Sequence, residues 1–564
     1  MIKKRINSLK KKLDKLNIDG YIIPKNDEYF SEYVSHNRLK FISNFSGSAG
    51  FAVILKKTNY LFVDGRYTIQ AKNQSGKIFN IIEIHKSLPY KIFKNIKLGF
   101  DPKLFTSAQL NLYFRNKVKL LAIEENLIKY PLKKKNKISY FYSLPEKVVG
   151  KSHLKKIHLI SKLLHKNKSD FLFISAPENA AWLLNIRGSD IPFSPIPNCN
   201  LIISKNRQIF LISNKKKLSK LVRQGKISKK QIVEPKMFRQ LISNLNGKNI
   251  IIDSKTCSVF KEKIIRSKFN IIKNLDPCYF LKSIKSSKEI IHMKKSHIED
   301  GVALTKFLYW IKNPNRKKIT EIEAEKKLEQ FRKGNKNYLY PSFNTIAGSG
   351  PNGAIIHYRA NKDTNRIIKK KDLFLCDSGG QYKYGTTDVT RTICFSKQPT
   401  KIKNIFTKVL KGHISVANCD LNKNKFGAMI DILARKYLKK SGLDYAHGTG
   451  HGVGFFSNVH EGPQSISKFN RIKLKEGMVL SNEPGYYKEG KFGIRIENLI
   501  FIKKVKKKLM FENLTMAPID KDLINQNLLT PSEKKYLFKY DLEIYKNLSK
   551  FLNKNERTWL LQSI

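Results

Sequence analysis

Five residues that can bind a hard metal ion occur between positions 377 and 497, each inside a distinctive string. The strings are CDSGGQY with Asp377, GTTDVTRT with Asp388, HGTGHGVG with His451, SNEPGYY with Glu483 and GIRIEN with Glu497. If the four carboxylates are buried together they need cations, because desolvated like charges repel. Two divalent ions would neutralise them, and such a pair, held about 3.5–4 Å apart, can activate one water.

Each string also has an ordinary structural interpretation. A lone aspartate after a strand usually caps a helix or closes a turn, and a lone glutamate at a strand end is usually on the surface. The string HGTGHG could cradle a phosphate, although it lacks the Walker and dinucleotide patterns. The joint occurrence of all five residues favours a metal site, and their oxygen-rich chemistry suits Mn²⁺, Fe²⁺, Co²⁺ or Zn²⁺.

The first half of the chain predicts two α/β domains. Residues 1–150 open with an amphipathic helix that includes Leu13 to Ile18, and the apolar runs GYIIP, FAVIL and YLFVDG that follow are typical of buried strands. Residues 151–285 open with the helical HLKKIHLISKLLHK and continue with strands such as FLFIS and NLIIS. The two segments have a similar order of elements, but no repeat can be aligned between them.

The second half has a different pattern. A broad apolar stripe predicts a long helix over residues 287–312, and a second helix is expected over 321–331. Strand-like runs with glycine-containing turns follow over 340–501, and the chain ends in a helical tail. The expected division is therefore 1–150, 151–285, 286–510 for the domain that carries the metal strings, and 511–564 for a C-terminal extension.

The charge of the chain allows a nucleic-acid or anionic-membrane function. The 564 residues carry 109 basic and 44 acidic side chains, for a net charge of +65. However, 91 of the basic residues are lysine and only 18 are arginine, which indicates an AT-rich coding sequence rather than a phosphate-binding face. The charge is also spread unevenly, at +18 over residues 1–150 but +1 over residues 441–500. We therefore do not expect nucleic-acid binding.

The composition also bears on the cell compartment. No apolar run approaches the roughly 18 residues that a membrane-spanning helix needs, and no secretory h-region is seen near the start. The six cysteines form no CxxC pair, so we expect reduced, buried thiols. These features predict a cytoplasmic protein without a membrane span.

Further strings carry a resemblance to a known family. They are FISNFSGSAG and VDGRY in the first segment, AWLLNIRGSDIP in the second and NTIAGSGPNGAIIHY before Asp377. With the five metal strings, they make the sequence resemble the creatinase/methionine-aminopeptidase (pita-bread) family, and within it the cytosolic three-domain aminopeptidase P type. The resemblance is weakest between about residues 210 and 285. It implies two creatinase-N-like α/β domains, a pita-bread catalytic domain and a helical C-terminal extension.

The resemblance also implies a role for each metal-binding residue. Asp377 would bind one metal ion, whereas Asp388 and Glu497 would bridge both. His451 and Glu483 would hold the second ion. Glu483 would in addition act as general base on the bridging water.

Four more site residues follow from the resemblance. His357 in IIHY would contact the scissile region of the substrate, and His460 in NVHEGP would stabilise the tetrahedral intermediate. His447 would lie near the proline side of the substrate. Arg495 would support the site.

The implied activity is that of a metal-dependent aminopeptidase, which hydrolyses the bond between an N-terminal residue and a penultimate proline. Two divalent ions per chain are expected, with Mn²⁺ favoured and Zn²⁺ or Co²⁺ as alternatives, and relatives of this type form homodimers. One alternative is a prolidase, which cleaves Xaa-Pro dipeptides. Another is a catalytically altered member of the family that binds nucleic acid, but such proteins usually lose ligands, and all five are present here.

Overall fold

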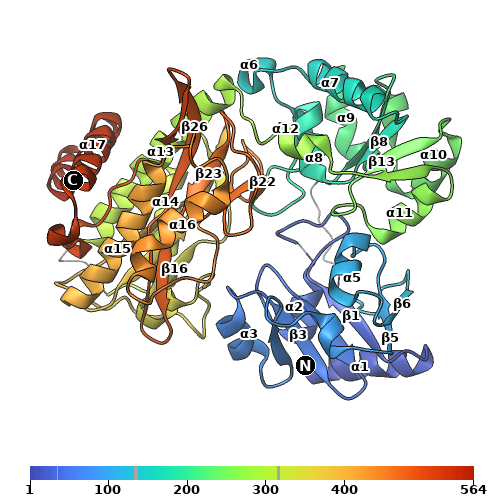
Figure 1. Cartoon of the computed structure of the whole chain (residues 1–564), viewed down its shortest axis with the longest axis horizontal. Helices are drawn as coiled ribbons and strands as arrows, with labels where there is room; N and C mark the ends of the chain where they lie inside the picture. The colour runs from blue at the N-terminus through green and yellow to red at the C-terminus, as the bar shows by residue number, and fades with distance from the viewer. Residues whose placement is uncertain (35, 132–137, 314–317) are drawn as a thin grey trace. The chain divides into compact units, whose positions relative to one another are not determined.

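The computed structural model describes residues 1–34, 36–131, 138–313 and 318–564. These residues form two compact units, Met1–Tyr279 and Phe280–Ile564 (Figure 1). Both units mix helices with sheets, as the sequence predicts. The finer boundaries at residues 150, 285 and 510 stay predictions.

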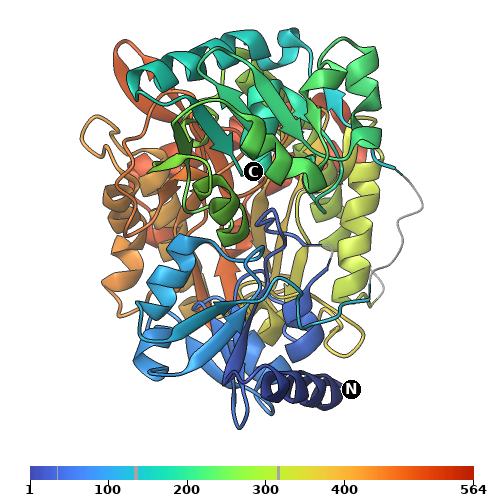
Figure 2. The same ribbon diagram turned by 90° about the vertical axis from the view of Figure 1, so that its right-hand side faces the viewer.

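The first sheet of the N-terminal unit has six strands in the order β4-β3-β2-β1-β5-β6. Their bounds are β1 Gly20–Pro24, β2 Phe51–Leu55, β3 Asn59–Val63, β4 Asn80–Glu83, β5 Lys97–Phe100 and β6 Lys119–Ala122. Strand β1 is buried throughout, and its successive residues enter different cores, Ile22 on one face and Ile23 on the other. Alternating side chains point to opposite faces of a strand, so both faces of this sheet are covered (Figure 2).

The second sheet repeats the topology of the first. Its order is β12-β11-β10-β8-β13-β14, and its central strands pair as those of the first sheet do, antiparallel on one side of β8 and parallel on the other. The bounds are β8 Phe171–Ile174, β10 Asn200–Ser204, β11 Ile209–Ile212, β12 Ile232–Val233, β13 Asn249–Ile252 and β14 Asn270–Lys273. A short pair of β7 Tyr142–Ser143 and β9 Ile186–Arg187 lies outside this sheet. This shared topology agrees with the similar order of elements expected for the two segments. No residue alignment shows it, because it preserves strand directions and not residues.

Twelve α-helices accompany these sheets in the described part of residues 1–281. They are α1 Ile2–Lys15, α2 Arg38–Ser43, α3 Thr68–Ser75, α4 Pro89–Ile92, α5 Ser107–Phe114, α6 Glu146–Val149, α7 His153–Lys166, α8 Pro177–Leu184, α9 Lys215–Arg223, α10 Phe238–Asn244, α11 Val259–Arg266 and α12 Pro277–Leu281. Helix α7 has the predicted bounds. Helix α1 ends earlier than predicted, because Asn17 adopts a φ of 49° that ends the helical backbone, and Ile18 packs into the core beyond it.

Two helices open the C-terminal unit where the sequence predicts them. Helix α13, Ser287–Ile311, begins with a capping box formed by Ser286 and Glu289. Helix α14, Glu321–Lys333, begins with a capping box formed by Thr320 and Glu323. The apolar side chains of both helices share one core with strands of the unit.

The strands of the C-terminal unit form small antiparallel sheets. One has the order β16-β17-β20 and another the order β22-β21-β23-β26-β27. The remaining groups are β15-β18-β19 and β24-β25. Their bounds are β15 Tyr338–Pro341, β16 Ile346–Ser349, β17 Phe374–Ser378, β18 Gly380–Tyr382, β19 Gly385–Thr386, β20 Val389–Ile393, β21 Gly450–Gly452, β22 Glu461–Ile466, β23 Val479–Asn482, β24 Gly485–Lys488, β25 Phe492–Arg495, β26 Asn498–Val505 and β27 Lys508–Asn513.

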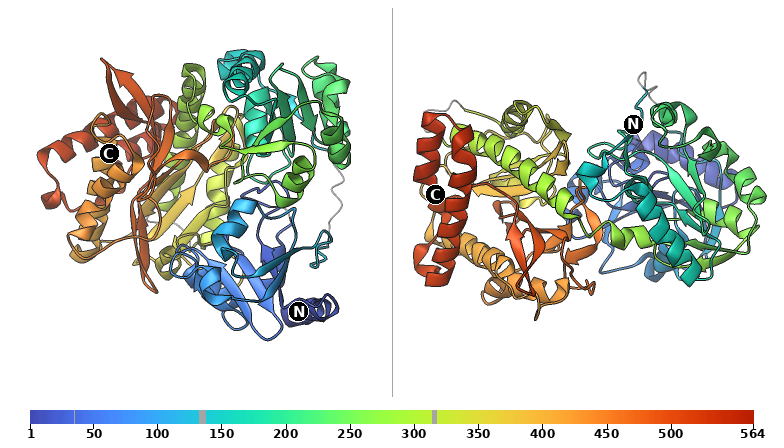
Figure 3. Two further views of the ribbon diagram at one scale, coloured as in Figure 1. Left: turned by 45° about the vertical axis from the view of Figure 1, so that its right-hand side comes forward. Right: turned by 90° about the horizontal axis from the view of Figure 1, so that it is seen from above.

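Helices complete the unit around these sheets. Helices α15, Thr400–Ala417, and α16, Gly427–Lys439, lie between β20 and β21 in the chain, and α17, Pro531–Leu548, and α18, Lys554–Ser563, form the predicted helical tail (Figure 3). Buried side chains of α15 and α17 share a core with residues of β25. All six cysteines are free and buried. Within the described residues, no helix has the length and apolar character needed to cross a membrane.

Candidate metal centre

Two neighbouring strands bring the first two candidate ligands together. Asp377 lies on β17, whose register pairs it with Thr390 on β20, and Asp388 directly precedes β20. Asp377 and Asp388 are 8% and 3% exposed. The apolar residues of the same strands, among them Phe374, enter the core on the other side, which fixes the strand that carries the carboxylates.

A second sheet supplies the other three candidates. His451 lies on β21, Glu483 directly follows β23, and Glu497 directly precedes β26. Because β23 and β26 are antiparallel and pair Asn482 with Asn498, they bring Glu483 and Glu497 to the same end. The backbone N–H of Glu497 donates to the carbonyl of Thr390 at 3.2 Å, which joins this sheet to the one that carries Asp377.

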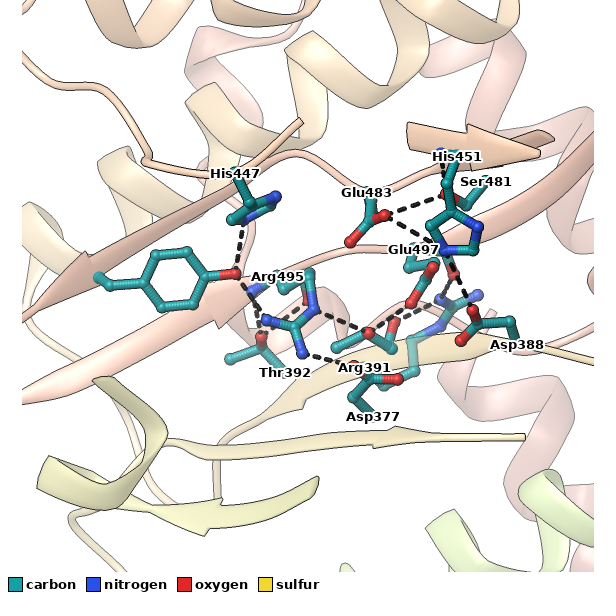
Figure 4. Close-up of polar contacts among 12 residues, drawn as sticks. Asp377, Asp388, Arg391, Thr392, His447, His451, Ser481, Glu483, Arg495 and Glu497 are labelled. Carbon is teal, nitrogen blue, oxygen red and sulfur yellow. Dashed lines mark hydrogen bonds and ion pairs between the residues drawn. The ribbon is translucent and has the colours of Figure 1, made fainter. Parts of the chain in front are cut away.

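Three of the five candidate ligands converge on one point, and Glu483 and Asp377 lie beside them (Figure 4). Ligand atoms of Asp388, His451 and Glu497 all lie within 4.8 Å of one another. The Nε2 atom of His451 is 3.4 Å from Oδ2 of Asp388 and 3.5 Å from Oε1 of Glu483. Its Nδ1 lies 3.0 Å from the carbonyl of Gly452, and an N–H donated there directs Nε2 at the carboxylates.

The electrostatics of the cluster fit a cation site. Burial and the neighbouring carboxylates raise the pKa of Asp377 to about 7, against the opposing effect of Arg495, and raise the pKa of Glu497 further above its usual range. Burial opposes protonation of His451, but Asp388 and Glu483 raise its pKa to about 9. The Oδ1 atoms of Asp377 and Asp388 are buried and receive no hydrogen bond from the residues that the structure describes. Acceptors that are crowded, desolvated and unpaired in this way are typical ligands for divalent ions.

Arg495 connects the carboxylates to the side of the site that carries His447. It donates to Oδ2 of Asp377 at 2.5 Å, to Oγ1 of Thr390 at 3.1 Å and to the hydroxyl of Tyr487 at 2.6 Å. The same hydroxyl lies 2.8 Å from Nε2 of His447. One continuous chain of hydrogen bonds therefore runs from Asp377 to His447.

The two other predicted histidines have different surroundings. The ring of His460 packs against that of His451 with 4.2 Å between centroids and an interplanar angle of 64°. His357 is half-buried on the turn that follows the 3-10 helix η3, Gly350–Ala354. The structure thus places His460 beside the cluster and His357 on a neighbouring segment.

Three residues of the site were not predicted from the sequence, two that hold candidate ligands and one that joins Arg495 to His447. Thr390 donates to Oε2 of Glu497 at 2.6 Å, Ser481 donates to Oε1 of Glu483 at 3.0 Å, and Tyr487 bridges two site residues. Strand alternation could have found the first two, because each lies two residues from a ligand and so on the same face.

Models of known protein families match four consecutive parts of the chain. Two models described as the creatinase/prolidase N-terminal domain match residues 5–125 and 130–289. Metallopeptidase family M24 matches residues 291–504, and the C-terminal region of peptidase M24 matches residues 507–564.

The relatives are similar over their full length. A Laccaria bicolor protein named "Probable Xaa-Pro aminopeptidase P" is 34% identical over 603 residues, which cover 99% of this chain and 92% of the relative. The structure of a Caenorhabditis elegans X-prolyl aminopeptidase, described as a cytosolic enzyme with a di-nuclear active site, matches with a TM-score of 0.91 at 29% identity and covers 100% of this chain and 99% of its own. A Thermococcus sibiricus prolidase matches with a TM-score of 0.52 at 27% identity and covers 65% of this chain and 98% of its own.

The fold and the family expected from the sequence are therefore confirmed. The order of domains is two creatinase N-terminal α/β domains, a pita-bread M24 domain and a C-terminal region. This chain belongs to metallopeptidase family M24 and, within it, to the Xaa-Pro aminopeptidase P family.

Proposed function

We propose that this protein is a metal-dependent aminopeptidase that hydrolyses the bond between an N-terminal residue and a penultimate proline. The observation that carries the proposal is the convergence of Asp388, His451 and Glu497, with Asp377 and Glu483 beside them. Two divalent ions bound there would polarise the scissile carbonyl and lower the pKa of a water. Asp377 would hold one ion, Asp388 and Glu497 both, and His451 and Glu483 the other.

The side chains around these ligands have separate tasks. Glu483 takes the proton of the attacking water and later delivers it to the leaving nitrogen, and the hydroxyl of Ser481 orients it. His460 donates a hydrogen bond to the developing oxyanion. His357 contacts the scissile region, and His447, held by Tyr487, faces the proline side.

The preference for proline has a physical reason. An amide nitrogen that belongs to proline has no N–H, so a pocket that requires this donor rejects it. A site for Xaa-Pro must accept a ring of fixed φ instead. Arg495 supports such a site by fixing Asp377 and Tyr487 relative to each other.

Three finer features belong to the same proposal. We propose Mn²⁺ as the native metal, with Zn²⁺ or Co²⁺ as alternatives, because oxygen-rich sites with one imidazole accept all three. We also propose a homodimer in the cytoplasm. The Caenorhabditis elegans relative, described as a cytosolic enzyme with a di-nuclear active site, supports the compartment and the paired metals.

The alternative function is that of a prolidase. The prolidase fold accounts for only 65% of this chain, whereas the X-prolyl aminopeptidase covers all of it, and this difference favours the longer substrates. A panel of Xaa-Pro dipeptides and Xaa-Pro-Yaa tripeptides, tested with the apo-protein plus each metal, separates the two functions. Metal-dependent release of the first residue from tripeptides supports the proposal, and cleavage of dipeptides alone would favour a prolidase.

A further inference from the structure

A buried cluster of three charged side chains includes the residue that follows His460 in the chain. The next residue in the chain, Glu461, makes an ion pair with Lys285 through Oε1 and another with Lys282 through Oε2 at 3.2 Å. All three side chains are 3% exposed or less. This Lys282–Glu461–Lys285 cluster joins the segment that enters α13 to a residue 176 positions away from Lys285.

The lysine side of the cluster is fixed by the backbone. The N–H of Lys285 donates to the carbonyl of Gly477 at 2.9 Å, and the neighbouring Ile284 forms a bridge with Met478. The ammonium of Lys285 also donates to the carbonyl of Ser283 at 3.3 Å. The backbone that carries Lys285 is therefore fixed, and its ammonium has a second acceptor besides Glu461.

The backbone of Glu461 is held beside the strand that carries the candidate ligand His451. In the β21–β22 pair, Glu461 lies opposite Gly452, the residue after His451, where the register is irregular. A Cβ at Gly452 would lie 2.2 Å from the carbonyl of Glu461, and one at Gly454 would lie 3.0 Å from its Oε2. A side chain at position 452 would thus collide with the backbone of Glu461, and one at position 454 would crowd its carboxylate.

We infer that Glu461, clamped by Lys282 and Lys285, is a positioning residue that fixes the ring of His460 for the reaction. The inference rests on the proposed function, which assigns the oxyanion to His460. A buried carboxylate with two ammonium partners has little freedom, because any displacement leaves charges desolvated and unpaired. The ring one residue earlier, packed at 4.2 Å on His451, shares this restriction.

A double-mutant cycle with the metal-loaded full chain tests the inference. Glu461→Gln keeps the shape and removes the charge, and we expect kcat to fall about tenfold, within the range of coupling between neighbouring side chains, with KM and metal content unchanged. In the His460→Ala background the same substitution should change kcat less than about twofold, because the group it positions is gone. Equal losses in both backgrounds would overturn the inference.

A matched buried pair provides the control. Lys411 and Glu533 form an ion pair with side chains 11% and 9% exposed, between α15 and α17. Lys411→Met should lower the melting temperature but should change kcat by the same factor with and without His460. This control separates the effect of losing any buried charge from the effect of losing the orientation of His460.

Two further tests apply if Glu461→Gln does not fold. Lys285→Met removes one partner and should reproduce the kinetic effect, and Lys285→Arg, which keeps the charge, should restore at least part of it. Crystal structures of the wild type and Lys285→Met should show one ring orientation for His460 in the first and a displaced or doubled one in the second. An unchanged His460 ring in Lys285→Met would overturn the inference even in a protein without activity. A wild type that cleaves no Xaa-Pro peptide would count against the proposed function instead.

Discussion

Arg495 donates a hydrogen bond of 2.5 Å to Oδ2 of Asp377, and both side chains are buried. The guanidinium thus supplies a fixed positive charge beside a group of carboxylates that repel one another. It does so without filling the point where Asp388, His451 and Glu497 meet. This arrangement leaves the remaining negative charge for cations.

Tyr487→Phe should lower the free energy of unfolding. The substitution removes the hydroxyl that accepts from Arg495 at 2.6 Å and lies 2.8 Å from His447, and the loss should be about 1–3 kcal/mol because a buried donor is left unsatisfied. The adjacent Tyr486→Phe is the control, expected to stay within about 0.5 kcal/mol. Denaturant unfolding measures both, and equal losses would show that the hydrogen bonds are not responsible.

Asp388→Asn should abolish the binding of both metal ions. The amide keeps the shape but not the charge, and a bridging ligand serves both ions, so its loss affects the whole site. Elemental analysis after dialysis should give about two ions per chain in the wild type and far fewer in the variant. Asp363→Asn, at an exposed aspartate of the same unit, should retain full metal content. A variant that keeps its metal would exclude Asp388 as a ligand.

Glu483→Gln should lower kcat by about 10²–10⁴-fold, the range for loss of a general base. The amide accepts the hydrogen bond of Ser481 as the carboxylate does, so the orientation should survive. Glu489→Gln, at an exposed turn, is the matched control. Metal content should be measured alongside, because a near-normal kcat with normal metal would place the base elsewhere.

The pH dependence of stability should include a contribution from His413. Burial, and to a smaller extent Arg391, lowers the pKa of this side chain on α15 to about 3. In the unfolded chain its pKa is about 6.5, so below that pH the unfolded state binds a proton that the folded state does not, and stability falls as the pH falls toward 3. His413→Gln cannot be protonated, so its melting temperature should fall less steeply below about pH 6.5. Parallel curves for the two proteins would contradict this assignment.

Helices and strands were predictable where the apolar pattern of one continuous segment determines them. Helix α7 follows from its own apolar stripe, and β1 follows from an apolar run between turns. The shared topology of the two N-terminal sheets was predictable only through the resemblance to creatinase N-terminal domains, because strand order and direction depend on contacts between distant segments. The end of α1 at Lys15 depends on the backbone of Asn17, which the apolar pattern does not report.

The five candidate ligands were predictable because the strings that contain them together resemble the motifs of a known family. The partners that hold them come from elsewhere in the chain, as when Arg495 reaches Asp377 across 118 positions and Lys285 reaches Glu461 across 176. A single sequence contains both members of each pair but does not indicate that they meet.

Cleavage at a penultimate proline is tested most directly by product analysis of three peptides. The metal-loaded protein should release arginine from Arg-Pro-Pro, cut Arg-Ala-Pro far more slowly, and leave acetylated Arg-Pro-Pro intact, because a free α-amine would meet the carboxylates of the metal site. Equal rates on the first two peptides would contradict a site dedicated to proline. Cleavage of the acetylated peptide would contradict an aminopeptidase.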